Sequence, residues 1–258
     1  MIWFLPIILY VIICIVIYVF QEKIIFRGKR YRKDFPYHYD NKFKEIFLKT
    51  PDGAELNALI FYQETNSKGL IFYLHGNRGH LARSGNFFNY VKQYEYDVFM
   101  YDYRGYGKST GEMSYEAICN DTLLMFDYAK EIYRNAPIVV FGNSIGSSLA
   151  AYIASQRNVE RLILESPFYN LKSLLSIRYF YLPIALLLKY PFPTNKFLEQ
   201  VHCPVFIIHG DADKMAPLSG AIKLKEQCKG SIIVLQGVGH DGKKEFSIYH
   251  EALREVLK

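Results

Sequence analysis

A serine lies between two glycines where an apolar run gives way to a helical pattern. The run "IVVFGNSIGSS" places Ser144 between Gly142 and Gly146. A G-x-S-x-G stretch at a strand-to-helix junction can hold a serine hydroxyl on a sharp, exposed turn, where it can act as a nucleophile. The same residues can form an ordinary turn, and the pattern arises by chance in roughly one chain in ten of this length. The pattern alone therefore leaves both interpretations open.

A serine nucleophile needs a base and a carboxylate, and both residue types follow later strand patterns. Asp211 and Asp213 follow the apolar run "VFIIHG", and His240 follows "SIIVLQG". A histidine can take the serine proton during attack, and a carboxylate can fix the imidazole tautomer and stabilise the imidazolium. In hydrolases with a G-x-S-x-G turn, the order along the chain is likewise serine, acid, histidine. We therefore interpret Ser144 as a nucleophile and His240 as its base.

Attack on a carbonyl also requires hydrogen-bond donors for the oxyanion. The first predicted donor is the backbone N–H of Ile145, the residue after the nucleophile. The second is the backbone N–H of Asn77 in "YLHGNRGH", a loop that follows an early strand pattern and in which Gly76 lets the backbone turn toward the site. His75 and His209 are expected to orient loops by hydrogen bonding rather than to transfer protons.

The segments that would position these groups alternate between strand and helix patterns. Residues 44–50 and 55–63 flank the turn "PDG" and are predicted to form an antiparallel hairpin. Beyond it, short runs of Ile, Val, Leu and Phe predict strands at 69–75, 96–103, 137–141, 161–167, 204–210 and 231–237. Helices are predicted at 80–94, 114–133, 145–156, 219–228 and 246–258. This alternation predicts a three-layer α/β domain with a mostly parallel central sheet, an antiparallel start and catalytic groups at the carboxyl ends of the strands.

Five motifs together resemble those of one superfamily. In chain order, "LHGNRG", "YDYRGYGKSTG", "GNSIGSS", "HGDADKMAP" and "GHDG" resemble the motifs of the α/β-hydrolase superfamily, most closely its small-lid serine hydrolases and membrane-associated α/β-hydrolase-domain proteins. The resemblance covers roughly residues 45–258 and implies the α/β-hydrolase fold with a Ser-His-Asp triad. The family pattern H-G-x-x-D-x-x-V-P is matched, with alanine in place of valine, by His209, Gly210, Asp213, Ala216 and Pro217.

From this pattern, the resemblance implies that the acid is Asp213 rather than Asp211. It also implies a structural role for Arg104 beside the mouth of the site. Relatives include esterases, lysophospholipases, thioesterases and peptidases, so the resemblance does not name the substrate.

The first residues of the chain differ in kind from the rest. Residues 1–21 carry no charged side chain, a length sufficient to cross a bilayer as a helix. A positive leading region, a shorter apolar core and a small-residue cleavage site would mark a cleavable signal peptide, and the sequence has none of these. We therefore predict a single transmembrane anchor at 1–21.

A basic segment follows the predicted anchor. Residues 22–34 carry a net charge of +4 out of +6 for the whole chain. This concentration favours attraction to anionic lipid headgroups over a nucleic-acid surface. We predict a basic linker at 22–44 and a hydrolase domain at 45–258, which the positive-inside rule places in the cytoplasm. The four cysteines lack C-x-x-C spacing, which argues against a zinc site or a disulfide framework.

An apolar, aromatic stretch at 168–200 falls where this fold carries a lid. Three prolines divide it into short pieces, and its run "LPIALLLKY" is too short to span a bilayer. The lid could contact lipid, line an acyl pocket or cover the core of the domain.

These features predict a membrane-anchored serine hydrolase. It would cleave acyl esters or thioesters of lipid-like or acylated substrates through an acyl-enzyme intermediate, a mechanism that requires neither metal nor cofactor. The alternatives are a serine peptidase of the same fold and a catalytically silent scaffold. A complete triad argues against the scaffold, and the sequence makes no prediction of oligomeric state.

Overall fold

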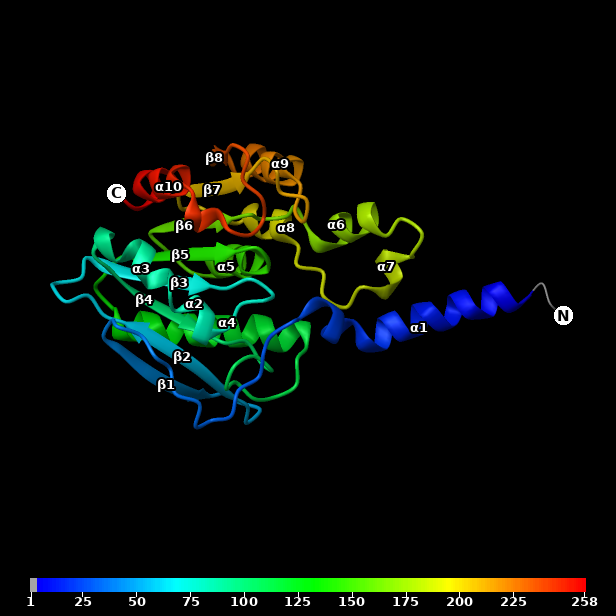
Figure 1. The fold of residues 1–258 in the computed structure, drawn as a ribbon, viewed down its shortest axis with the longest axis horizontal. Helices are drawn as coiled ribbons and strands as arrows, with labels where there is room; N and C mark the ends of the chain where they lie inside the picture. Colours follow the sequence, from blue (N-terminus) through cyan, green and yellow to red (C-terminus); the bar gives the residue numbers. More distant parts are fainter. Residues whose placement is uncertain (1–3) are drawn as a thin grey trace.

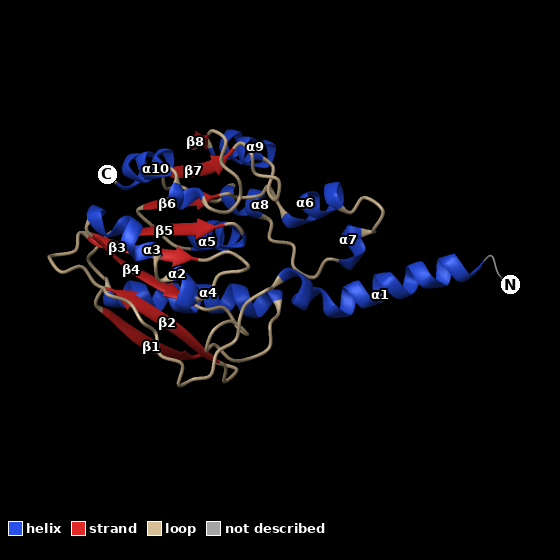
Figure 2. Cartoon of the chain, viewed as in Figure 1, coloured by secondary structure: helices blue, strands red, loops and turns tan. Residues whose placement is uncertain are grey.

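A computed structural model describes residues 4–258, so the first three residues of the predicted anchor lie outside the described residues. Its central sheet has eight strands in the order β1-β2-β4-β3-β5-β6-β7-β8 (Figures 1 and 2). β1 (Phe43–Lys49) pairs antiparallel with β2 (Glu55–Phe61), which pairs antiparallel with β4 (Tyr96–Tyr101). The parallel part of the sheet joins β4 to β3 (Gly69–Leu74), β5 (Ile138–Asn143), β6 (Arg161–Glu165), β7 (Val205–Gly210) and β8 (Ser231–Leu235). The predicted mostly parallel sheet with an antiparallel start is confirmed.

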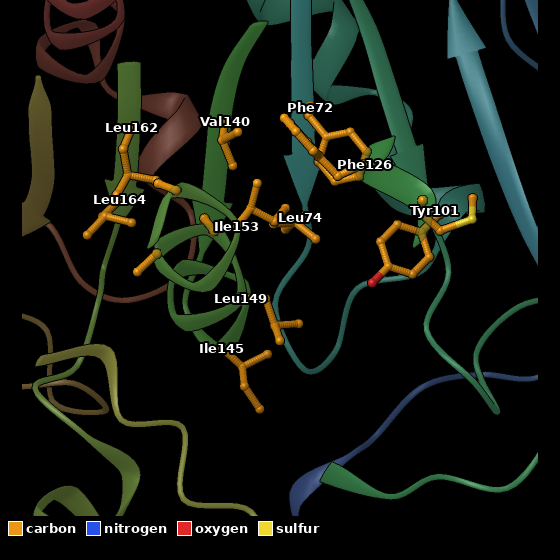
Figure 3. Close-up of a cluster of buried hydrophobic side chains, with 14 of the residues drawn as sticks. Phe72, Leu74, Tyr101, Phe126, Val140, Ile145, Leu149, Ile153, Leu162 and Leu164 are labelled. Atoms are coloured by element: carbon orange, nitrogen blue, oxygen red, sulfur yellow. The ribbon is translucent and has the colours of Figure 1, made fainter. Parts of the chain in front are cut away.

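Helices cover both faces of this sheet and enclose two separate apolar cores. One core lies beneath α4 (Tyr115–Ile132), α5 (Ile145–Gln156), α8 (Thr194–Leu198) and α9 (Leu218–Cys228). The other lies beneath α2 (Leu81–Ser84), α3 (Phe87–Val91) and α10 (Ser247–Leu257). Figure 3 shows Ile145, Leu149 and Ile153 of α5 among strand residues such as Val140 and Leu162. The central strands are buried on both faces because each face packs against helices, as the three-layer prediction requires.

The predicted single helix at 80–94 is wrong, because the segment forms α2, α3 and a short 3-10 turn, η2 (Lys92–Tyr94). The break comes at Gly85, where an added Cβ would lie 2.4 Å from the ring of Tyr39. Glycine at this position leaves room for the ring of Tyr39, while the backbone of Gly85 itself stays in the right-handed helical region (φ −57°, ψ −27°). By contrast, α4 begins where predicted, since the Ser114 side chain accepts a hydrogen bond from the Ala117 N–H at 3.0 Å.

The N-terminal helix α1 (Leu5–Ile25) projects from the body of the molecule (Figure 1). It is long and apolar enough to cross a membrane, a property it shares with signal sequences, and its one buried residue is Gln21. Two short helices of the 168–200 stretch, α6 (Leu171–Arg178) and α7 (Ile184–Leu187), lie on the same side of the molecule, and α7 contacts α1. A 3-10 turn, η3 (Lys243–Glu245), precedes α10.

Candidate active site

Ser144 occupies the turn between β5 and α5 in a strained backbone conformation. Its φ of 53° and ψ of −117° lie in a region that non-glycine residues rarely adopt. The turn is held by a 2.8 Å hydrogen bond from the Ser144 N–H to the carbonyl of Glu165. An added Cβ would lie 2.3 Å from the Gly146 oxygen if placed at Gly142, and 2.3 Å from the Leu74 oxygen if placed at Gly146. Both glycines are therefore needed for strand and helix to approach this closely.

The serine begins a series of side-chain hydrogen bonds. The Ser144 Oγ lies 3.1 Å from Nε2 of His240, and Nδ1 of His240 lies 2.7 Å from Oδ2 of Asp213. Because an ionised carboxylate only accepts hydrogen bonds, Nδ1–H donates to Asp213. The lone pair of Nε2 is then free to accept the serine hydroxyl. The sequence-predicted nucleophile, base and acid thus lie together at the carboxyl ends of their strands.

The environment of Asp213 favours its ionised form. Burial alone would raise the pKa of this carboxyl, but hydrogen bonds from His240 and the Ala216 N–H outweigh burial and hold the pKa below its usual value. Oδ1 accepts the N–H groups of Met215 at 2.9 Å and Ala216 at 2.8 Å. Asp211, by contrast, is exposed and accepts the Gly237 N–H at 2.7 Å, which is a turn contact.

The two predicted oxyanion donors are backbone N–H groups near the serine. Ile145 is the first residue of α5, and Asn77 lines the same pocket as Ser144 from the loop after β3. Within residues 4–258, neither N–H has a hydrogen-bond acceptor. An N–H at the start of a helix has no acceptor within that helix. Both groups are therefore available to an incoming oxygen.

Asn77 is held in place by the end of α1. Its side-chain Nδ2 donates to the carbonyl of Ile25 at 3.0 Å, and its own carbonyl accepts the Arg27 N–H at 3.2 Å. The Tyr106 hydroxyl also donates to the Asn77 carbonyl, at 2.8 Å. These long-range contacts have no signal in the local sequence.

Two buried histidines bind loop backbone, as expected. Nδ1 of His75 donates to the Gly76 carbonyl at 2.8 Å, and Nε2 of His209 donates to the Ala216 carbonyl at 2.8 Å. Burial lowers the pKa of His209, which favours the neutral ring. Neither histidine approaches the serine as His240 does.

The pocket beside Ser144 has a volume of about 320 Å³ and is lined by four cationic side chains that sequence analysis missed: Arg78, Arg83, Lys243 and Lys244. Lys243 is buried, donates to the His240 carbonyl and lies 3.5 Å from Glu165. Across the described chain, the other three cations have no carboxylate within 4.0 Å. Burial lowers the pKa of Lys244, whose ammonium lies 5.2 and 5.0 Å from the ring centroids of Phe87 and Tyr90. The lining also carries the carboxylates Glu165, Asp241 and Glu245, so the pocket holds charges of both signs with a small excess of cations.

Glu165 is a second residue that the sequence did not single out. It lies buried at the end of β6, where it accepts hydrogen bonds from Asn143 Nδ2 at 2.7 Å and the Tyr249 hydroxyl at 2.8 Å. Its backbone carbonyl holds the Ser144 N–H, so it supports the nucleophile turn from behind. The only available signal was a glutamate closing the apolar run "RLILE".

Arg104 is a structural residue. Its guanidinium forms bidentate hydrogen bonds to Asp52 and to Asp121, at 2.6 to 2.9 Å, and its side chain is buried outside the pocket lining. The arginine therefore ties the turn after β1 to α4, in agreement with the role that the motif resemblance implied.

Comparisons with known sequences place the chain among hydrolases. Residues 65–199, just over half the chain, match the family model of serine aminopeptidase, S33; this range includes Ser144 and ends before Asp213 and His240. An uncharacterized protein of Mycobacterium tuberculosis is 28% identical over 203 residues, covering 77% of this chain and 72% of that protein. The lysophosphatidylserine lipase ABHD12 of Xenopus tropicalis is 30% identical over 206 residues, covering 69% of this chain and 51% of the lipase. The chain thus matches about half the length of that lipase.

Solved structures share the fold. An esterase from Pyrococcus furiosus has a TM-score of 0.71 at 17% identity, covering 89% of this chain and 94% of the esterase. A soluble variant of the monoglyceride lipase from Saccharomyces cerevisiae has a TM-score of 0.63 at 14% identity, covering 86% of this chain and 97% of the lipase. The fold expected from the sequence motifs is thereby confirmed.

Proposed function

Because the chain belongs to the serine aminopeptidase S33 family of α/β hydrolases, we propose that it is a membrane-anchored serine hydrolase that cleaves acyl ester or thioester bonds. The observation that carries this proposal is the hydrogen-bonded series from Ser144 through His240 to Asp213. Two free backbone N–H groups beside the serine complete the set of groups that acyl transfer requires.

The reaction follows from this arrangement. The Ser144 Oγ attacks the substrate carbonyl while Nε2 of His240 takes its proton, and Asp213 stabilises the imidazolium that forms. The N–H groups of Ile145 and Asn77 donate to the oxyanion. Collapse of the tetrahedral intermediate expels the alcohol or thiol, which takes the proton from His240. Water then attacks the acyl-enzyme, with His240 again as base.

The charge of the pocket supports an anionic substrate. Among the described residues, no carboxylate lies within 4.0 Å of Arg78, Arg83 or Lys244, which would attract a phosphate or carboxylate on the part of the substrate that leaves. The relative named a lysophosphatidylserine lipase supports the same class of acyl ester. An aminopeptidase must instead bind the ammonium group of a peptide, which the excess of cations disfavours although Asp241 and Glu245 also line the pocket. The charges therefore favour an ester or thioester over the peptidase alternative.

The anchor and its orientation are part of the proposal. Residues 1–21 would cross the bilayer, residues 22–44 would lie at the anionic surface, and residues 45–258 would face the cytoplasm. Part of the basic segment packs on the domain, since Tyr31 N–H donates to the Gly107 carbonyl at 2.7 Å and Gly107 N–H donates to the Lys29 carbonyl at 2.8 Å. A reporter enzyme fused after Lys258 that works only outside the cytoplasm should stay inactive; activity would overturn this orientation.

The activity can be tested with the full chain in detergent micelles. The substrates would be a p-nitrophenyl acyl ester, an acyl thioester, an anionic lysophospholipid and an aminoacyl anilide. We expect hydrolysis of acyl esters or thioesters by the wild type and by Ser148→Ala, a neighbouring buried serine of α5, and none by Ser144→Ala. Hydrolysis of the anilide alone would establish the peptidase. A folded wild type that cleaves none of the four and is not labelled by a fluorophosphonate would establish the scaffold.

A further inference from the structure

The uncharged stretch of α1 and an uncharged stretch of the predicted lid end at the same level. Residues 1–21 and residues 179–188 carry no charged side chain, and Glu22 and Lys189 are the first charged residues that follow them. Glu22 and Lys189 lie 3.3 Å apart. Gln21 joins α1 to the lid at the same level. Its Nε2 donates to the Leu187 carbonyl at 2.8 Å, and its Oε1 accepts the Lys189 N–H at 2.9 Å. The boundary between apolar and charged residues is therefore shared by the two segments.

A second contact places the lid far along α1. The Tyr10 hydroxyl donates to the Tyr181 carbonyl at 2.8 Å. Tyr10 precedes Gln21 by eleven residues, which corresponds to about 16 Å along a helix axis. A bilayer core is about 30 Å thick, so a contact at this height lies well inside it if α1 crosses the membrane from the level of Gln21.

The residues at this height are apolar and exposed. In the lid tip, which we define as residues 177–187, the most exposed large apolar residues are Phe180 (84%), Leu186 (82%), Ile177 (76%) and Tyr181 (59%). A protein rarely leaves neighbouring side chains of this size in water unless something covers them. The one charge in the tip, Arg178, has a stem long enough to reach the headgroups.

Unpaired N–H and C=O groups are costly in a medium without water, and most carbonyls in the bend of the lid tip are paired. Leu182 N–H donates to the Tyr179 carbonyl, and the Tyr10 hydroxyl donates to the Tyr181 carbonyl. Ile184 N–H donates to the Leu182 carbonyl, and Leu186 N–H donates to the Pro183 carbonyl. Pro183 itself has no N–H to satisfy. Four of the five carbonyls in the bend at 179–183 are thus paired, and within residues 4–258 only that of Phe180 has no partner.

We propose that the lid tip inserts into the hydrocarbon of the bilayer beside α1, so that anchor and lid enter the membrane as one hydrogen-bonded unit. The proposal rests on the membrane anchoring proposed above, and its partner is the lipid bilayer rather than a protein. In Figure 1 the arrowheads of β5 and β7, which precede Ser144 and Asp213, point toward the side where α1, α6 and α7 lie. Insertion would therefore turn the catalytic edge of the sheet toward the source of a lipid-like substrate.

Tryptophan fluorescence of the full chain in liposomes tests this. The single tryptophan, Trp3, is replaced by phenylalanine, and one new tryptophan is introduced as Phe180→Trp, with Leu186→Trp as a second variant in the lid tip. Val11→Trp reports on α1. Ile132→Trp is the matched control, because Ile132 is exposed (48%) and is the last residue of α4. Each is measured in phosphatidylcholine–phosphatidylglycerol liposomes with and without bromine on the acyl chains.

We expect Val11→Trp and both lid-tip variants to emit at short wavelength and to lose most of their fluorescence to brominated lipid, and Ile132→Trp to do neither. Quenching of Val11→Trp without quenching of either lid-tip variant would overturn the lid proposal and leave the anchor standing. A short-wavelength but unquenched lid tip would mean a protein cover, such as a second copy, and would also overturn it. Absence of quenching in all variants would overturn both lid and anchor. Hydrolysis of a soluble ester by the same preparations reports separately on the hydrolase.

Discussion

The side-chain amide of Asn77 donates a hydrogen bond to the carbonyl of Ile25, at a distance of 3.0 Å. This contact joins the last residue of α1 to the residue whose N–H is proposed to hold the oxyanion. The Arg27 N–H adds a second bond between the same segments. The segment that leaves the anchor is thus part of the support of the candidate active site, so its removal should affect the chemistry as well as the location of the protein.

Replacing Asn77 by alanine should lower kcat while changing KM little. The variant keeps the backbone N–H but loses the bond to Ile25, so the donor is held less firmly where the oxyanion forms. Loss of a whole oxyanion donor lowers kcat by about 10²–10³-fold; a loosened donor should lower it by about tenfold. Steady-state kinetics on a soluble ester measures this. Asn89→Ala, which removes only a surface contact with Asn41, is the control; an Asn77→Ala variant as active as this control would show that the bond does not position the donor.

Replacing Gly146 by alanine should both destabilise the protein and reduce its activity. The new Cβ would meet the Leu74 oxygen at 2.3 Å, and backbone at this position cannot yield without moving the nucleophile turn. Overpacking of this kind costs about 1–3 kcal/mol. Gly220→Ala in α9 is the matched control, because its nearest contact is an ordinary 3.4 Å and alanine is favoured in helices. The midpoint temperature of thermal unfolding should fall for Gly146→Ala and rise for Gly220→Ala. Equal shifts of the two midpoints would contradict the crowding at Gly146.

Replacing Arg83 or Lys244 by glutamine should weaken binding of anionic acyl esters selectively. A charge pair near a protein surface contributes on the order of 1 kcal/mol or more, so KM for a lysophospholipid with an anionic headgroup should rise by about tenfold. KM for a neutral monoacylglycerol with the same acyl chain should stay nearly constant. The KM values for both substrates should also stay constant in Arg134→Gln, which lies two residues beyond the end of α4. Equal changes for the two substrates would indicate that the cations do not select charge.

The free energy of unfolding should fall as the pH drops below about 6.5, the ordinary pKa of histidine. Burial holds the pKa of His209 below that value in the folded protein. The unfolded chain therefore binds a proton more readily in this range, so the stabilisation is complete above about pH 6.5 and declines as the pH falls. Between pH 7.5 and pH 5.5, the free energy of unfolding should decline less for His209→Asn than for the wild type. Some decline remains because burial also lowers the pKa of His80; an unchanged decline would contradict the assignment to His209.

Much of the fold could be predicted because its signals are local. The apolar strands, the Ser114 cap of α4 and the small residues around Ser144 each act over a few neighbours, and the strand ends then bring Ser144, Asp213 and His240 to one edge of the sheet. The helix predicted at 80–94 is instead interrupted at Gly85, which packs against the ring of Tyr39, a residue distant in sequence. Local pattern does not report such a contact.

The remainder of the candidate site depends on side chains that meet only in the folded chain. Arg83 and Lys244 line one pocket although 160 positions separate them, and neither lies in a pattern that marks a binding residue. The bonds from Asn77 to the end of α1 and from Gln21 to the lid likewise join segments far apart in sequence. The catalytic roles of Ser144, Asp213 and His240 remain predictions that chemistry must test.

Covalent labelling of the folded, full-length protein with a fluorophosphonate tests the nucleophile most directly, because the reagent reacts with a serine only when a base activates it. Intact mass and peptide mapping should show one adduct, on Ser144, which forms in the wild type and in Ser148→Ala and is absent from Ser144→Ala. No adduct on the folded wild type, or equal labelling of Ser144→Ala, would contradict the proposal that Ser144 is an activated nucleophile.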